Sequence, residues 1–486
     1  GGSLHAVSGT WGAGIGSILG QDSGDIVING GKVTGEAHDS SQGAGIGGGD
    51  GGAGNVTING GTVSGTGYVG AGIGGGVGGD GNVTIKDGSV TAKGGNVGAG
   101  IGSGGNGGTS NVTITGGVIE KAAGGMEGAG IGGGNEDDGN VTITGGTIKE
   151  ATGGDFIGAA GIGGGRDGNA DIKISNATIG TVTGGGGGSG IGTGSGGESS
   201  TIKIKDTTIE KATGNGGGAG IGTGMGGKSS DITLDNVTVK NAEGSGAGIG
   251  GGDATVKIKN GSNVTATGSS NASGVGSSSY SNANVTIEDS TVNATGGDSG
   301  AGVGAVNGRD ATVKIKNSTV TGKGSGGIGV GAGGTATVTI EGGSTITAEG
   351  TDGSGIGGNA GADVTIKDST VTKASGGSNG SGIGASQAGP SGNSTIKIIN
   401  SKILASLGGV AGIGGGTNTN VSITDKSDVG TVTGGNAGIG SNGGNTTVTI
   451  DHSHVTSATG TADVGIGSSH GSATVKITGN SRVETV

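Results

Sequence analysis

A short motif recurs through the whole chain: a small residue, then Gly, one aliphatic residue and Gly. Gly12-Ala13-Gly14-Ile15-Gly16 is the first copy. Its aliphatic residue occurs seventeen times, at intervals of 25 to 31 residues, at Ile15, Ile46, Ile73, Ile101, Ile131, Ile162, Ile191, Ile221, Ile249, Val275, Val303, Ile328, Ile356, Ile383, Ile413, Ile439 and Ile466. A period of this length is typical of repeat proteins, in which each unit packs against its neighbours. We therefore expect residues 1–486 to form a single continuous repeat domain.

A second pattern follows each motif by about ten residues. It is a triplet with apolar ends, such as Val56-Thr57-Ile58, and this period of two indicates a strand with one buried face. Two residues later comes Gly, Asn, Asp or, once, His, which are residues that tolerate a left-handed backbone, so a tight turn is expected there. Another aliphatic residue, Val63 in this unit, then begins a second strand.

The expected fold is all-β. Each unit of about 28 residues reads as strand, turn, strand, loop, Gly-rich strand and loop, which makes three short strands per coil. About seventeen coils stacked in register would bury ladders of Val and Ile and form a rod roughly 80 Å long. Collagen is excluded, because the 138 Gly do not recur at every third position and there is only 1 Pro. Disorder is excluded because the aliphatic residues recur in phase.

These repeats resemble right-handed parallel β-helix proteins, the pectate-lyase-like solenoids, whose coils also combine an Asn-rich turn with aliphatic stacks. The resemblance covers the whole chain and implies a right-handed parallel β-helix. Gly-Ala-Gly-Ile-Gly-Gly-Gly, as at residues 43–49, is also similar to units of large Gly-rich repetitive bacterial cell-surface and adhesin proteins. That second resemblance implies export and attachment.

Composition limits the partners. The net charge of −12 leaves no basic stripe, so we expect no nucleic-acid binding. The absence of Cys excludes disulfides and thiolate chemistry and is compatible with the cytosol or with a Gram-positive type of exterior. No run of eighteen apolar residues predicts a membrane span. The chain starts without Met and stops directly after a strand-like segment, so we expect a segment of a longer protein.

Acidic residues form the candidate metal site. Asp138 and Asp167 each begin an Asp-Gly-Asn sequence in neighbouring units, and Asp137 and Glu136 add further charge. Carboxylates stacked in this way bind Ca²⁺ or are neutralised by a cation such as Arg166. The pattern leaves both readings open, a calcium site or an ordinary solvated turn. No other cofactor is expected.

Catalysis is not expected. A polysaccharide lyase needs a base beside a calcium cluster, and only Lys173 and Lys203 form a small basic spot. Stacking on sugars also has little support, because Trp11, Tyr68, Phe156 and Tyr280 are scattered over distant units, and local packing is the expected role of these rings. Regular outward Thr-x-Thr segments would suit an ice-binding face, although lysines interrupt the columns.

Recognition is expected in the loops between the second strand and the Gly motif, because they vary most; 33–46 and 148–162 are the long examples. Strand alternation also predicts that Gly14 and Gly16 point outward, so that the glycines form a smooth association surface or meet a demand for positive φ.

The leading hypothesis is a non-enzymatic extracellular structural or adhesive β-solenoid at the cell surface, a stalk or fibre component. It would present loops to a surface or polysaccharide partner and associate with itself laterally or end to end. The alternatives are an ice-binding solenoid and a β-helix that binds or cleaves polysaccharide.

Overall fold

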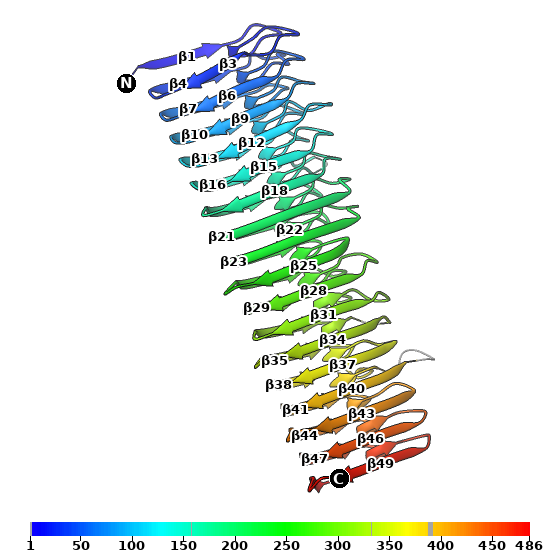
Figure 1. Ribbon diagram of the computed structural model, residues 1–486. Coiled ribbons are helices and arrows are strands. Elements are labelled where there is room, and N and C mark those ends of the chain that lie inside the picture. The colour runs from blue at the N-terminus through cyan, green and yellow to red at the C-terminus, as the bar shows by residue number, and fades with distance from the viewer. Residues whose placement is uncertain (1, 157, 332, 387–391) are drawn as a thin grey trace. The chain divides into compact units, whose positions relative to one another are not determined.

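The computed structural model describes residues 2–156, 158–331, 333–386 and 392–486. Every described element is a strand, and each coil contributes a first strand, a second strand and a Gly-rich short strand that pair in parallel with the same strands of the next coil (Figure 1). The predicted all-β parallel β-solenoid of about 28 residues per coil is therefore confirmed. No helix is present among the described residues, and hence none long and apolar enough to cross a membrane.

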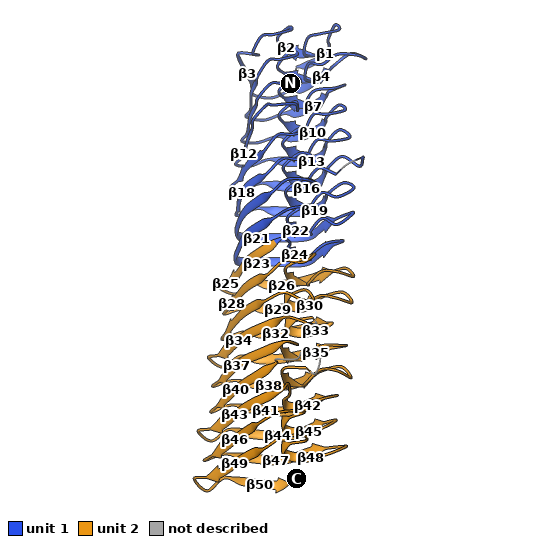
Figure 2. Ribbon diagram, turned by 90° about the vertical axis from the view of Figure 1, so that its right-hand side faces the viewer, with its two compact units in different colours: residues 1–252 blue, residues 253–486 orange. Residues whose placement is uncertain are grey.

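The coils form two compact units, residues 1–252 and 253–486, which Figure 2 colours blue and orange. In unit 1 the first strands are β3 (Asp25–Ile28), β6 (Gly54–Ile58), β9 (Gly81–Ile85), β12 (Ser110–Ile114), β15 (Gly139–Ile143) and β18 (Ala170–Ser175). Its second strands are β1 (Ser3–Val7), β4 (Lys32–Glu36), β7 (Thr62–Thr66), β10 (Ser89–Lys93), β13 (Val118–Ala123), β16 (Thr147–Thr152) and β19 (Thr178–Thr183). In two coils the first and second strands continue as one, β21 (Ser199–Gly214) and β23 (Ser229–Gly244). The short strands are β2 (Ile15–Gly16), β5 (Ile46–Gly47), β8 (Ile73–Gly74), β11 (Ile101–Gly102), β14 (Ile131–Gly132), β17 (Ile162–Gly163), β20 (Ile191–Gly192), β22 (Ile221–Gly222) and β24 (Ile249–Gly250).

Unit 2 repeats the arrangement. Its first strands are β25 (Asp253–Lys259), β28 (Ala283–Glu288), β31 (Ala311–Lys316), β34 (Thr335–Glu341), β37 (Gly361–Lys367), β40 (Asn393–Ile399), β43 (Asn418–Thr424), β46 (Thr446–Asp451) and β49 (Ala473–Thr478). Its second strands are β26 (Asn263–Gly268), β29 (Thr291–Thr295), β32 (Thr319–Gly324), β35 (Thr345–Gly350), β38 (Thr370–Ser375), β41 (Lys402–Gly408), β44 (Asp428–Gly434), β47 (His454–Gly460) and β50 (Arg482–Thr485). Its short strands are β27 (Val275–Gly276), β30 (Ala301–Ala305), β33 (Gly326–Val330), β36 (Ile356–Gly357), β39 (Ile383–Gly384), β42 (Ala411–Gly414), β45 (Ala437–Ser441) and β48 (Val464–Ser468).

The core consists of aliphatic ladders. Val56, Val83 and Val112 are register partners in successive first strands, and each is at most 1% exposed. Removing such a side chain from water contributes about 1.5 to 3 kcal/mol. The ladder register thus follows from the triplet pattern, because a slip of one residue would expose every aliphatic side chain.

The tight turn lies where it was predicted, but the residue with positive φ differs between coils. Asn176 and Asp289 have φ of 52° and 49°, two residues past the triplet, as expected. In the first five coils the positive φ falls one residue later, at Gly31, Gly61, Gly88, Gly117 and Gly146. Glycine adopts positive φ without steric cost, so in these coils the preceding residue does not need a positive φ.

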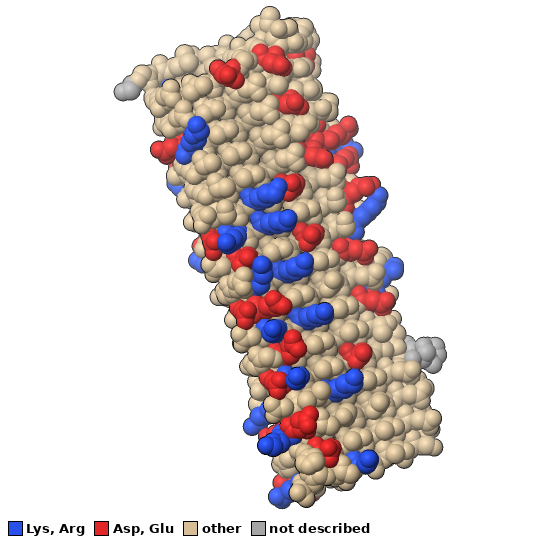
Figure 3. Space-filling view, in the orientation of Figure 1, with Lys and Arg blue, Asp and Glu red and all other residues tan. Residues whose placement is uncertain are grey.

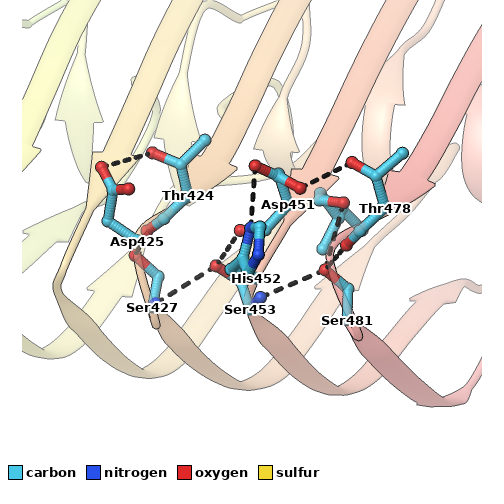
Figure 4. A network of polar contacts seen from close by, with 9 residues as sticks. Thr424, Asp425, Ser427, Asp451, His452, Ser453, Thr478 and Ser481 are labelled. Carbon is cyan, nitrogen blue, oxygen red and sulfur yellow. Dashed lines mark hydrogen bonds and ion pairs between the residues drawn. The ribbon is translucent and has the colours of Figure 1, made fainter.

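A ladder of serines supports the turns of unit 2. The Ser401 N–H donates to Ser427 Oγ over 3.2 Å, and the Ser427 N–H donates to Ser453 Oγ over 3.2 Å. The Ser427 hydroxyl itself donates to the Thr424 carbonyl oxygen over 2.7 Å. Figure 4 shows that the ladder continues to Ser481, which accepts the Ser453 N–H over 3.1 Å. Each serine therefore satisfies a buried backbone N–H of the preceding coil.

Charged side chains on the second strands pair between coils. Lys149 contacts Glu120 at 2.7 Å and Lys121 contacts Glu150 at 2.8 Å, and Figure 3 shows interspersed acidic and basic residues on the face that it presents. Exposed pairs of this kind contribute about 0 to 1 kcal/mol each. They complement the register rather than establish it.

The prediction that the motif glycines point outward is wrong. Gly14 is half-buried, and although Gly16 of the first coil is exposed, a Cβ on either would lie under 3.0 Å from backbone of the neighbouring coil. In the second to sixteenth coils both glycines that flank the aliphatic residue are buried. A Cβ on Gly45 would lie under 3.0 Å from the backbone of Thr66 in the second strand. A Cβ on Gly132 would lie under 3.0 Å from the carbonyl oxygen of Gly163 in the next coil, and Gly132 has φ of 133°. The glycines serve close backbone approach inside the coil stack and form no external strip.

This geometry predicts a sharp contrast between two glycine substitutions. Gly132→Ala should lower the free energy of unfolding by at least about 3 kcal/mol, because strain at positive φ adds to the backbone overlap. Gly30→Ala should change it by less than about 1 kcal/mol, because a Cβ there meets nothing within 4 Å and no positive φ is required. Thermal and denaturant melts measure both, and equal stability of the two variants would contradict the account.

Candidate functional site

Four neighbouring side chains lie on the stacked loops that follow β7, β10, β13 and β16. The Asn96 N–H donates to the Tyr68 carbonyl oxygen over 3.1 Å, and the Phe156 N–H donates to the Met126 carbonyl oxygen over 3.3 Å. Between them, the Glu127 N–H donates to the Asn96 carbonyl oxygen over 3.2 Å. Tyr68, Asn96, Met126 and Phe156 therefore lie on four successive stacked loops, with a shift of one residue between the Asn96 and Met126 loops, and we call these four residues the loop ridge.

The loop ridge is unusual because its apolar side chains face water. Tyr68 is 44% exposed, Met126 50% and Phe156 70%, whereas the aliphatic ladders are fully buried. Clustered exposed aromatic and Met side chains are typical of binding surfaces.

The expectation that the aromatic rings are scattered is wrong for Tyr68 and Phe156 and holds for Trp11 and Tyr280, which lie on other coils. Tyr68 and Phe156 lie on the same groove. Trp11 and Tyr280 are also exposed, at 49% and 79%, and Arg309 lies 5.9 Å from the centre of the Tyr280 ring. The sequence did not reveal that Tyr68 and Phe156 are neighbours, because residues 68 and 156 come onto one surface only when the coils stack.

The groove beside the loop ridge has a volume of about 750 Å³ and a floor made of backbone. Its floor glycines are Gly67, Gly94, Gly95, Gly124, Gly125, Gly153 and Gly154. A Cβ on Gly125 would lie under 3.0 Å from the Gly95 carbonyl oxygen, and one on Gly154 would meet Gly125 in the same way. The close stacking of the loops thus excludes side chains from the floor and leaves it open.

Polar groups surround this floor. Asn96, Lys93 and Asp155 are exposed, and Thr152 is half-buried. The lining therefore combines one cation, one anion, an amide and the Thr152 hydroxyl with the apolar side chains of the loop ridge. The variable-loop prediction is consistent with this position, since the 148–162 loop contributes Thr152, Asp155 and Phe156; its Ile157 lies outside the described residues. The 33–46 loop contributes nothing to the lining.

The predicted acidic residues take different roles. Asp138 is exposed, and its Oδ1 accepts the Asn169 N–H of the next coil over 2.8 Å. Asp167 has φ of 60°, and its carboxylate lies 3.2 Å from Arg166 Nε. Arg166 also contacts Glu127 at 3.3 Å, so this cation neutralises Asp167, as the sequence allowed, and Glu127 as well.

Asp137 is buried at 1% exposure. Its Oδ2 accepts the Gly105 N–H over 3.0 Å, and its Oδ1 accepts the Gly107 N–H over 2.9 Å. Burial raises the pKa of Asp137 from 3.8 to about 6, although hydrogen bonds from Ser103 and the glycine N–H groups oppose this rise. This carboxylate is thus an internal acceptor that anchors the 105–108 loop.

Among the described residues, no group of three or more His, Asp or Glu is placed to hold a metal ion. Asp137, Asp138 and Asp167 each have protein donors or a cationic partner instead. A calcium ion at these residues stays a prediction.

An uncharged array covers the outward face of β6, β9, β12 and β15. Thr57, Thr84, Thr113 and Thr142 are register partners, as are Asn55, Asn82, Asn111 and Asn140. The asparagines form an amide ladder, in which Asn82 Nδ2 donates to Asn55 Oδ1 over 2.9 Å and Asn111 Nδ2 to Asn82 Oδ1 over 3.0 Å. Lysines begin in the next coils, where Lys173 and Lys203 are register partners.

A second hollow lies in unit 2, over β44, β47 and β50, with a volume of about 710 Å³. His454 Nδ1 lies 3.0 Å from Asp428 Oδ1, and its Nε2 lies 3.1 Å from Glu484 Oε1. The hydrogen bond with Asp428 and the contact with Glu484 raise the pKa of His454. Both ring nitrogens are therefore engaged by carboxylates.

Asp137 generates a pH prediction. Its folded-state pKa lies above that of the unfolded chain, so protonation stabilises the fold, and the free energy of unfolding should increase as pH falls from 7 through 6 toward 4. A rise from 3.8 to about 6 corresponds to about 3 kcal/mol at most. Asp137→Asn should remove this part of the pH dependence in thermal melts.

Asp138→Asn is the matched control, because its side chain is exposed, and it should keep the wild-type pH profile. His454 adds stability in the same direction below its raised pKa, but it does so equally in all three proteins. Parallel profiles for wild type and Asp137→Asn would contradict the assignment.

Comparison with known proteins supports the fold alone. The family model described as beta helix repeat matches residues 26–50, 83–105, 112–135, 141–166, 238–253, 285–308, 338–361 and 364–387. No curated protein and no solved structure matches the chain. Most matched stretches run from a first strand to the loop after a short strand, which is the repeat seen in the structure. The chain is therefore a β-helix repeat protein that forms a β-solenoid.

Proposed function

We propose that the chain is a non-enzymatic extracellular structural and adhesive β-solenoid, a stalk or fibre component that holds a surface ligand in the groove beside the loop ridge. The observation that carries this proposal is the alignment of exposed Tyr68, Met126 and Phe156 along the groove. Exposed apolar side chains lower the solubility of a protein, and a ligand that covers them removes apolar surface from water.

The chemistry of the groove favours binding over turnover. The ionisable side chains among its described lining residues are Tyr68, Lys93 and Asp155. A lyase or hydrolase requires an acid and a base positioned around one bond, commonly with shifted pKa values. The buried carboxylate of Asp137, whose pKa is raised, is not part of the groove lining.

The scaffold suits a binding role because it is rigid under the ridge. Glycine stacking and backbone hydrogen bonds between loops fix the backbone from which the ridge side chains project. Preorganisation of this kind lowers the entropic cost of association. Extracellular placement rests on the likeness of the Gly-rich units to bacterial surface proteins and agrees with the absence of Cys.

Replacing Met126 and Phe156 together by Ser should reduce attachment about tenfold or more and leave the melting temperature unchanged, because both side chains are exposed. Beads coated with the chain, tested on bacterial cell walls, plant fibres and animal matrix, provide the measurement. Met225→Ser is the control, because Met225 is 48% exposed but does not line the groove. Undiminished attachment of the double variant would refute the proposal.

A second candidate function is ice binding by the Asn-Thr array. Its side chains repeat at about 4.8 Å between coils, carry no charge, and are held by the amide ladder, as a flat lattice surface demands. Thermal hysteresis should be present in wild type and lost on replacing Thr84 and Thr113 by Lys. Thr286→Lys is the control. Its register partners in the two neighbouring coils are Lys257 and Lys314, so a lysine is already tolerated at this position of the coil. Absence of hysteresis in the wild-type chain would exclude this function.

A further inference from the structure

We infer that the ligand of the groove is an uncharged polysaccharide chain, which lies along the loop ridge across the coils and stacks sugar rings on Tyr68 and Phe156. This inference rests on the proposed function, and it adds the chemical class and the direction of the ligand.

The positions of the two rings define an elongated ligand. Tyr68 and Phe156 are separated by three coil steps, which correspond to about 14 Å at the spacing of parallel strands. Asn96 and Met126 lie on the two intermediate loops. A single sugar ring is too short to reach both aromatic rings, whereas a chain of several sugars contacts all four side chains.

The backbone of the loops argues against a peptide ligand that adds as a strand. Such a ligand needs free N–H and C=O groups along an edge. Here the Gly95, Gly125 and Gly154 N–H groups already donate to Gly70, Gly98 and Gly128 of the preceding loops over 2.9, 3.0 and 3.0 Å. The N–H groups of Asn96 and Phe156 also donate between coils, so we infer that recognition depends mainly on side chains and ring faces.

Sugars match these side chains. One face of a pyranose ring presents C–H groups with partial positive charge, which the negative face of an aromatic ring attracts, and this contact also removes apolar area from water. The hydroxyl groups at the sugar edge require planar amide and carboxylate partners, which Asn96 and Asp155 supply at the groove. Met126 offers an adaptable apolar contact between them.

The charge balance selects a neutral chain. Lys93 and Asp155 contribute one charge of each sign to the lining. A polyuronate carries a negative charge on every unit and would need a row of cations along the loop ridge. None of the four residues of the loop ridge, Tyr68, Asn96, Met126 and Phe156, is a cation. Lys173 and Lys203 lie on first strands, and Arg166, which reaches the loop of Met126, is already paired with Glu127 and Asp167.

The test measures binding of neutral glucan, mannan and xylan oligosaccharides of one to six units to the full chain by calorimetry. Affinity should rise at least tenfold from one sugar to four and then level off, as the ridge becomes covered. Tyr68→Ala and Phe156→Ala should each weaken binding of the four-unit ligand about tenfold. Tyr68→Phe should retain it, because the ring face is kept, and Met225→Ala should have no effect. Melting curves confirm that each variant is folded.

Several results would overturn the inference. If the alanine variants lose attachment to surfaces but the wild-type chain binds none of the neutral oligosaccharides, the groove has another ligand, such as a protein, and the adhesive function stands without the sugar. Preference for polygalacturonate over neutral chains, or affinity that does not depend on chain length, would equally reject it. If the alanine variants attach normally to every surface, both the inference and the proposed function fail.

Discussion

Close approach of backbone to backbone between coils is the constraint on which this structure depends. At the short strands, a Cβ on Gly102, Gly132 or Gly163 would overlap the carbonyl oxygen of the next coil, and each of these residues has φ between 133° and 142°. All seventeen copies of the motif share this positive φ. The glycine that follows the aliphatic residue of each motif therefore meets a steric requirement that recurs once per coil, and its entropic cost of about 0.5 to 1 kcal/mol is offset by the aliphatic ladders on the same coils.

The same constraint explains why the site lies on the loops. Stacked glycines such as Gly95, Gly125 and Gly154 bring the loop backbones together without side chains between them, and this creates a floor. Side chains that flank the floor then project outward at the coil spacing, so similar positions in successive loops become neighbours. A solenoid thus turns residues about 30 positions apart into one surface.

Polar ladders accompany the aliphatic ones. Serines at the turns of unit 2 and asparagines on β6, β9, β12 and β15 bond to their equivalents one coil away. The buried serines satisfy backbone N–H groups that would otherwise be unpaired, whereas the asparagines are half-buried or exposed and order a surface. Asp137 departs from this repetition, since a single carboxylate occupies an interior position among glycine N–H donors and keeps a raised pKa.

The sequence by itself determined the coil, its period, the strand triplets and the turns, because each depends on local patterns of two to five residues that recur in phase. It also placed variation in the loops after the second strands. Three features were decided only by the tertiary structure. The glycines of the motif point into the stack, since positive φ breaks the alternation on which the outward prediction relied. Asp137 is buried while its neighbour Asp138 is exposed, a difference that depends on how the 105–108 loop closes over it. Tyr68 and Phe156 share a groove because loop register, which no local pattern encodes, sets which residues of distant coils align.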